Sequence, residues 1–453
     1  MDPRIFIRNA FGRSLIFVAV CFLLPSCASV SGPALQPKVN GLLAAGNAQA
    51  ALEKITAKEA GYGSGNYLLY HLDRALVLQL TGDFSSSAQS LEKAKIRYEE
   101  LYTRSVTNEA STWVLNDNRT PYRAPAYERV LMNVFQAFNY LQMKDLNEAI
   151  VEARDLDSKF LVVPEVYARD KRRFEDNGFA RLLCGILYEA AGTGEDLNDA
   201  LISYKQALVV YDMYYGGEYV PAVLQENLIR LAEKFNDPDL GAYRARFPGV
   251  RPRRSLKDAA VVYAFESTGF SPVKVEEMMP VPLDRDLVTK IALPRFVFRL
   301  SAVQASHLVF KDPFGVLSVF PMEFGMDIAE LAEKDLEARK AMALAKAVAR
   351  PALKYLVERN QKEAIAKNQG EAAASIFGLF SSIFNFYTER ADLRSWQALP
   401  AQIRMTRVQV SAGIYHVSLE DVGKDGAVVS LKDKGESALD AGQTYFFIGR
   451  SLR

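Results

Sequence analysis

One polar and aromatic segment, residues 103–125, carries the residue types that recognise another molecule. Its sequence, TRSVTNEASTWVLNDNRTPYRAP, mixes aromatic rings with amide, carboxyl and guanidinium groups. Such mixtures are enriched where a protein surface holds a peptide, and connections longer than about 15 residues usually have a function or are mobile. We therefore predict a partner-binding site at Trp113, Asn116, Asp117, Asn118, Tyr122 and Arg123. A surface loop rich in Asx turns, with Trp113 as its packing anchor, is the alternative.

The chain contains no recognisable catalytic or metal-binding motif. Walker A, HExxH, GxSxG and paired CxxC patterns do not occur, and three Cys and three His are too scattered for a zinc site. Lys and Arg together number 55 against 54 for Asp and Glu, so no net field attracts nucleic acid. We expect no enzyme, no cofactor, no metal and no nucleic-acid partner, with a hydrolase built from scattered carboxylates as a minor alternative.

The N-terminal residues predict export and lipid attachment. Three arginines are followed by an apolar run over residues 15–24. The run ends in Leu24, and Pro25, Ser26 and Cys27 follow it. The apolar run is half the length of a bilayer-spanning helix, which is typical of a signal peptide. The last four residues, from Leu24 to Cys27, resemble the bacterial lipobox. This resemblance implies that residues 1–26 are removed and that Cys27 carries acyl chains, palmitate among them. An ordinary signal peptidase site is the alternative.

This resemblance to bacterial lipoproteins also indicates a location. Ala28 follows Cys27 where an inner-membrane retention signal carries Asp. We therefore expect the protein at the periplasmic face of the outer membrane, bound to the membrane through the acyl chains on Cys27.

Small and large apolar residues recur at the same spacing in three stretches between residues 70 and 210. The stretches centre on the turns at 81–84, 143–146 and 192–197, and their apolar residues follow at steps of three and four. Such steps place the residues on one face of each helix, and a small residue opposite a large one lets two helices approach closely. The pattern resembles tetratricopeptide (TPR) repeats, with an opening half-repeat near residue 46 and a capping helix over 221–235. We predict an all-helical domain over residues 27–250, with generic antiparallel helices as the alternative.

Longer segments resemble a poorly characterised family of bacterial lipoproteins. These segments include NDNRTPYR, YERVLMNVFQAFNYLQMKDLNEAIVEARDLD and DNGFARLLCGILYEAAG. The family combines TPR-like repeats with a C-terminal β-rich region, so the resemblance implies architecture and location but no chemistry.

The C-terminal half has mixed texture after a linker at 248–255. Runs of β-branched and alternating residues predict strands at 259–265, 288–293, 296–302 and 308–310, and a helical pattern covers 326–367. We divide this half into strands plus a long helix over 251–371, an apolar hairpin or helix over 372–390, and a small β-sandwich over 391–453. Near the start of the last segment, Asp392 and Arg394 are placed to pair and Trp396 to be buried, but a domain hinge is the favoured interpretation of residues 390–396.

The predicted fold class is therefore α+β: an N-terminal α-solenoid of TPR-like helix pairs, followed by a mixed region that ends in a small β-sandwich. Stacked helix pairs offer a groove that holds a peptide. The sequence favours a non-enzymatic envelope scaffold with a protein or peptide ligand in that groove. A factor that binds peptidoglycan, or activates an enzyme that builds it, is the alternative.

Overall fold

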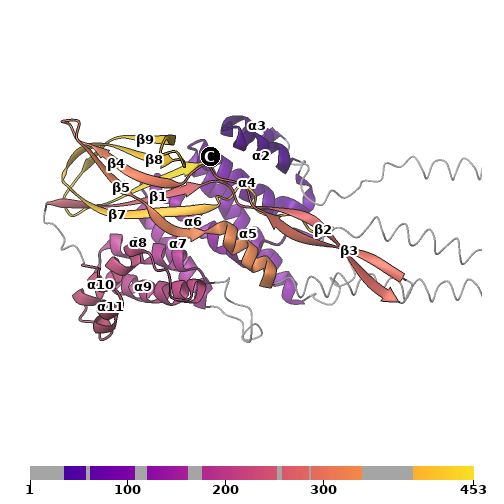
Figure 1. Ribbon diagram of the computed structural model, residues 1–453, viewed down its shortest axis with the longest axis horizontal. Coiled ribbons are helices and arrows are strands. Elements are labelled where there is room, and N and C mark those ends of the chain that lie inside the picture. Colours follow the sequence, from indigo (N-terminus) through magenta and orange to yellow (C-terminus); the bar gives the residue numbers. More distant parts are fainter. Residues whose placement is uncertain are drawn as a thin grey trace, which may run out of the picture.

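A computed structural model describes residues 35–57, 62–107, 120–161, 176–251, 258–284, 287–338 and 391–453. The described chain is α+β, with its helices first and its strands after residue 258 (Figure 1). Cys27, the residues 108–119 of the predicted partner-binding segment and the apolar segment 372–390 lie outside the described residues.

Consecutive helices pack against one another through the first half of the chain. The helices are α2 (Gln36–Ala44), α3 (Ala48–Ala57), η2 (Ser64–Asn66), α4 (Tyr67–Leu80), α5 (Phe84–Thr107), α6 (Ala126–Gln142), α7 (Leu146–Leu161), α8 (Gly178–Ala191), α9 (Gly194–Tyr215), α10 (Ala222–Lys234) and α11 (Leu240–Arg246). The three helix pairs predicted from the apolar spacing correspond to α4–α5, α6–α7 and α8–α9. Their small residues Ala75, Ala137 and Gly185 lie on buried helix faces, as the spacing predicts.

One turn geometry joins α2 to α3, α4 to α5, α6 to α7 and α10 to α11. A residue with positive φ (Gly46, Gly82, Lys144 or Asn236) ends the first helix, and an Asn or Asp follows it. In the α4–α5 turn, the N–H of Asp83 donates to the carbonyl of Leu78 over 3.0 Å, and the Asp83 carboxylate accepts the N–H of Ser86 over 3.0 Å. The turn therefore satisfies the end of one helix and the start of the next with two residues.

The strands form two four-stranded sheets and a separate hairpin. The strands are β1 (Ala259–Thr268), β2 (Val273–Asp284), β3 (Leu287–Val297), β4 (Ala305–Lys311), β5 (Leu317–Pro321), β6 (Glu323–Asp327), β7 (Gln402–Ser411), β8 (Gly413–Val422), β9 (Val428–Leu439) and β10 (Thr444–Ser451). The sheet orders are β10-β1-β7-β6 and β5-β4-β8-β9, while β2 and β3 pair with each other. Figure 1 shows this hairpin extending away from the two larger sheets.

Strand β1 explains how the helices and the two sheets share a core. Its side chains alternate between the two faces of the sheet. Tyr263 and Phe265 belong to the apolar cluster that includes the helices, whereas Val262 and Ala264 belong to a second cluster with residues of β4 and β8. The rings of Phe265 and of Phe138 in α6 lie 5.3 Å apart. The helices therefore cover one face of the first sheet, and the second sheet packs on the other.

The sheet pairing corrects the division predicted for the C-terminal half. Strand β1 lies between β7 and β10, and β4 pairs with β8, so strands from 258–327 and from 402–451 share both sheets. The predicted segments 251–371 and 391–453 are therefore not separate folding units. Residues 328–338 are helical, in agreement with the start of the predicted helix.

Strand β2 was not expected, because Pro280 and Pro282 interrupt its sequence. The structure accommodates both prolines because, in the described chain, each strand of this two-stranded hairpin has one edge without a partner strand. Proline has no N–H to donate, so it is tolerated in a strand with such an edge. The predicted strand at 288–293 lies within β3, which continues through Pro294 to Val297, whereas residues 298–302 of the strand predicted over 296–302 are not strand.

Candidate functional site

An extended segment of the chain itself, residues 391–399, lies against the helices on the side that faces the sheet. The side chain of Trp396 is fully buried, and its ring meets that of Phe135 edge to face at 6.1 Å. The main-chain N–H of Trp396 donates to the Glu128 carboxylate over 3.0 Å, and the main-chain N–H of Ala398 donates to the Asp73 carboxylate over 3.4 Å. We call residues 391–399 the strap, because side chains of the helices hold its main chain.

Arg394 fixes the start of the strap. Its guanidinium donates to both carboxylate oxygens of Asp392, over 2.8 and 2.7 Å, and to the Thr120 carbonyl over 2.9 Å. The pairing of Asp392 with Arg394 and the burial of Trp396, which the sequence also allowed, are both found in the structure. The strap is therefore joined to the turn before α6 as well as to the helices.

The two carboxyl groups that hold the strap are buried among apolar side chains. Burial raises the pKa of Asp73 to about 7, although hydrogen bonds from Tyr62 and Gln36 act in the opposite direction. Burial likewise raises the pKa of Glu128, against a hydrogen bond from Tyr122. Sequence analysis did not single out either residue. An acid inside the apolar run YLLYHLDRALVLQL was the available signal, because carboxyl groups are rarely fully buried without partners.

Two of the six predicted partner-binding residues, Tyr122 and Arg123, lie within the described chain, and they differ in how exposed they are. Arg123 is exposed. Tyr122 is buried, its hydroxyl donates to Glu128 over 2.6 Å, and its N–H donates to the Gly65 carbonyl over 2.8 Å. Tyr122 therefore belongs to the internal network around the strap, not to an exposed binding surface as predicted.

The inner face of the helices is also less open than the predicted groove. The strap covers α4 and α6, and the aromatic side chains of β1 pack on α6 and α8. An external peptide on this part of the face would have to displace buried rings. A partner in the arrangement described would therefore have to use other helix surfaces.

Helix α9 presents such a surface. Its inward side chains, among them Tyr204 and Tyr211, are buried. On its opposite side Ile202, Val209 and Met213 are exposed by 50%, 55% and 49%. These positions are spaced by seven and four residues, so they form one stripe along the helix, which we call the α9 stripe. Soluble helices usually carry polar residues on their outer side.

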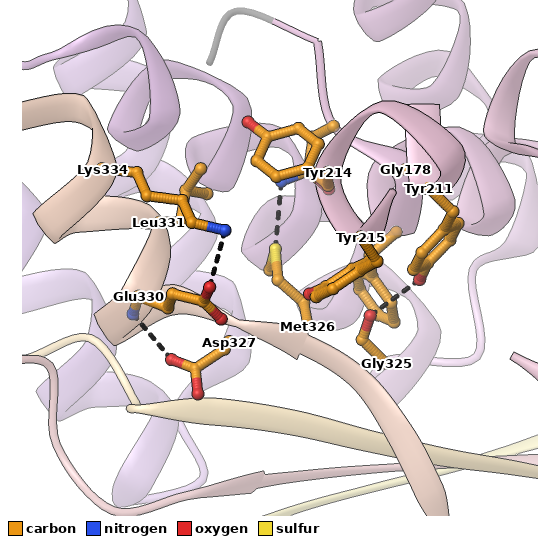
Figure 2. Close-up of a pocket in the computed structure, with 12 residues that line it drawn as sticks. Gly178, Tyr211, Tyr214, Tyr215, Gly325, Met326, Asp327, Glu330, Leu331 and Lys334 are labelled. Carbon is orange, nitrogen blue, oxygen red and sulfur yellow. Dashed lines mark hydrogen bonds and ion pairs between the residues drawn. The ribbon is translucent and has the colours of Figure 1, made fainter. Parts of the chain in front are cut away.

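A small cavity lies beside the C-terminal end of α9 (Figure 2). Its volume is about 30 Å³, and four elements surround it: α8, α9, β6 and the helical segment 328–338. Its lining residues are Asn177, Gly178, Phe179, Tyr211, Tyr214, Tyr215, Gly325, Met326, Asp327, Glu330, Leu331 and Lys334.

Close packing of β6 on the helices forms the floor of this cavity. The Tyr211 hydroxyl donates to the Gly325 carbonyl over 2.7 Å, and the Asn177 amide contacts the Met326 sulfur at 3.0 Å. A Cβ atom at Gly325 would lie 3.0 Å from the Phe179 ring and 3.1 Å from the Ile403 carbonyl oxygen. Because glycine has no Cβ atom, β6 can approach α8 closely at this position, and this close packing closes one side of the cavity.

The mouth of the cavity combines aromatic rings with charges. The Lys334 ammonium lies 5.9 Å from the ring centres of both Tyr214 and Tyr215 and 2.6 Å from the Glu330 carboxylate. Asp327 accepts the Glu330 N–H over 2.7 Å, and burial raises the pKa of Asp327. The arrangement holds one ammonium group between two rings and a carboxylate.

A second group of buried charges lies between the two sheets. The Lys432 ammonium is 2.7 Å from the Glu266 carboxylate and also contacts Asp421. Burial raises the pKa of Glu266 to about 8, with the charge of Lys432 acting in the opposite direction. Both carboxylates are fully buried, so the triad has the character of an internal ion cluster.

In comparisons with protein-family models, with curated proteins and with solved structures, no match to this chain was found. Within the described ranges, none of the helices has the length and apolar character needed to cross a bilayer. The assignment of function therefore rests on the residues and on their geometry.

Proposed function

We propose that this chain is a lipid-anchored envelope lipoprotein that acts as a non-enzymatic protein-binding scaffold. The anchor is Cys27, and the location is the periplasmic face of the outer membrane. The single observation that carries the scaffold function is the α9 stripe, an apolar surface left open on a helix whose other side is buried. Exposed apolar patches on folded proteins mark interaction sites.

The finer description of the fold belongs to the same proposal. The helices are TPR-like pairs, which the recurrence of one turn geometry at Gly46, Gly82, Lys144 and Asn236 supports. The two four-stranded sheets, with an apolar cluster between them, form a small β-sandwich. In such an array, outer helix surfaces remain available to partners when the inner face is occupied.

The anchor is tested by replacing Cys27 with Ala. Loss of the acyl chains, each worth about 0.8 kcal/mol per buried CH₂ group, removes the stable membrane attachment. We expect the Cys27→Ala protein to lose radiolabelled palmitate and to leave the sedimented membrane fraction, whereas Cys21→Ala keeps both. Undiminished sedimentation of Cys27→Ala would count against the anchor.

The scaffold function is tested from the centre of the α9 stripe. Gln206 is exposed between Ile202 and Val209, so a photo-crosslinking amino acid at 206 samples whatever covers the stripe in the cell. We expect a discrete protein adduct at 206 and none at Lys424, an exposed turn residue of the second sheet. The adduct should vanish in Val209→Asp, which places a charge in the stripe without touching a buried residue.

The same experiment separates the alternative function, a factor that binds peptidoglycan or activates an enzyme that builds it. Adducts that change mobility after lysozyme digestion favour the wall. Adducts insensitive to lysozyme and removed by protease favour the scaffold. Absence of any adduct at 206, with the folded protein on the membrane, would refute a partner on α9.

A further inference from the structure

We propose that the cavity at the end of α9 is a binding site for a primary ammonium group on an aliphatic stem, and that the Lys334 ammonium, at the edge of the cavity, makes the contacts of that group in the absence of a ligand. The cavity lies between Tyr214, Tyr215 and Glu330. The proposal goes beyond the proposed function, because the tyrosines that line the cavity lie on the other side of α9 from the α9 stripe. It is tested with small probes, so that it can fail while the scaffold function stands.

The contacts of Lys334 show what the site recognises. Two tyrosine rings and one carboxylate surround its ammonium, at 5.9, 5.9 and 2.6 Å. The faces of aromatic rings attract cations through their quadrupoles, and the attraction grows as water is excluded. Tyr215 and Tyr214 come from α9, whereas Lys334 comes from a different element (Figure 2). An ordinary ion pair within one helix needs no such rings.

The Lys334 side chain and its carboxylate partner are both partly exposed, so another ammonium group can replace that of Lys334. Its side chain is 39% exposed, and its carboxylate partner Glu330 is 44% exposed. Exposed ion pairs of this kind contribute about 0–1 kcal/mol. The Lys334 side chain can therefore turn into solvent at small cost, which leaves the rings and the carboxylate arranged around a vacated ammonium position.

The charged and apolar groups that line the cavity restrict the ligand. The Lys334 ammonium lies 2.6 Å from the Glu330 carboxylate, a hydrogen-bonding contact that a primary ammonium group can make and a trimethylammonium group cannot. The apolar side chains of Met326 and Leu331 line the same cavity and offer contacts to methylene groups. The preferred ligand is thus a primary amine with an alkyl stem.

The experiment is ligand-observed NMR titration of the purified full-length protein with n-butylammonium. The matched neutral probe is n-butanol, and the quaternary probe is tetramethylammonium. We expect weak binding to the wild type, because Lys334 competes, and binding at least tenfold tighter to Lys334→Ala. Lys334→Met, which keeps an alkyl stem in the site without the charge, serves as a second competition-free variant if Lys334→Ala does not fold.

The specificity of the site is tested in the Lys334→Ala background. Adding Glu330→Gln or Tyr215→Leu should weaken n-butylammonium binding at least fivefold, while thermal unfolding followed by circular dichroism confirms that each variant is folded. Equal binding of n-butanol and n-butylammonium, or tighter binding of tetramethylammonium, would overturn the proposal. So would unchanged binding in Glu330→Gln and Tyr215→Leu.

A last arm identifies the source of the ammonium. Nα-acetyl-lysine methylamide represents a lysine in a partner, and n-butylammonium represents a free amine. Binding of the lysine derivative at least as tight as that of n-butylammonium supports a partner lysine. Exclusion of the lysine derivative overturns that part and leaves a site for free amines. Either result is obtained without reference to the adducts at position 206.

Discussion

Asp73 is a buried carboxyl group whose protonation affects stability. Burial raises its pKa to about 7 in the folded protein, whereas an unfolded chain loses this proton near pH 4. Between these values the folded state binds more protons than the unfolded state. The contribution of Asp73 to the free energy of unfolding therefore falls as the pH rises from about 4 to 7.

We expect Asp73→Asn, which cannot ionise, to lack this dependence. At pH 5 the variant is less stable than the wild type by about 1 kcal/mol, because both oxygens of Asp73 accept hydrogen bonds and the amide nitrogen that replaces one of them cannot. At pH 8 the difference should shrink or change sign, by a change on the order of 2 kcal/mol. Urea unfolding at both pH values measures it, with exposed Glu195→Gln as the control. A difference that is the same at both pH values would show that Asp73 is not neutral at pH 5.

Residue types alone could not show which groups the carboxylates of Asp73 and Glu128 bind. The sequence shows that Asp73 and Glu128 lie within apolar helical patterns, which identifies them as unusual. Their partners are backbone N–H groups of Trp396 and Ala398, more than 200 residues away in the sequence. Main-chain donors carry no side-chain signature, so spacing and composition cannot locate them. Burial of Trp396 was considered from the sequence, but a domain hinge was the favoured interpretation of residues 390–396.

At the scale of elements, Lys144 is one of two non-glycine residues, with Asn236, at the positive-φ position of the four similar turns. Gly46 and Gly82 have φ angles of 77° and 82°, and Lys144 occupies the equivalent position at 61°. A side chain in this conformation is strained by about 1 kcal/mol, whereas glycine adopts it freely. We expect Lys144→Gly to raise the free energy of unfolding by about 0.5–1 kcal/mol.

The reciprocal change is the control. Gly82→Ala introduces the same strain at the equivalent turn, and no other atom lies within 4 Å of the new Cβ, so backbone conformation alone is tested. We expect a loss of about 1 kcal/mol, measured by urea unfolding of both variants under one set of conditions. Stabilisation by Gly82→Ala would contradict the turn geometry.

Helices were predicted more successfully than strands for a physical reason. A helix such as α4 or α6 carries its periodicity within one continuous segment, so steps of three and four suffice to locate it. A strand is completed by hydrogen bonds to another segment, so its identity depends on a partner. For this reason β2, whose sequence contains two prolines, was not predicted, and the strand predicted over 296–302 lies mostly beyond the end of β3.

At the scale of the whole molecule, strand sharing predicts an all-or-none fold for the sheets. Strand β1 is almost entirely buried and pairs with β7 on one side and β10 on the other. We expect a chain truncated after residue 440, which removes β10, to lose cooperative unfolding and to aggregate. Circular dichroism during thermal unfolding, with the full-length chain as reference, measures this. A truncated chain that melts cooperatively at the wild-type temperature would contradict the pairing.

The domain boundaries illustrate what composition can and cannot locate. The change of texture near residue 250 was visible, because helical periodicity stops there and β-branched runs begin. The merging of 258–327 with 402–451 into common sheets was not visible, since strand texture does not specify which strands are neighbours.

The parallel pairing of β1 with β10 has a consequence for biogenesis. A ribosome delivers β1 well before β10, so the edge of the nascent sheet stays unpaired while many later residues are still being made. Non-local pairing of this kind slows folding and lengthens the time in which an apolar edge can aggregate. Holding chaperones should therefore matter more for this protein than for one built of its helices alone.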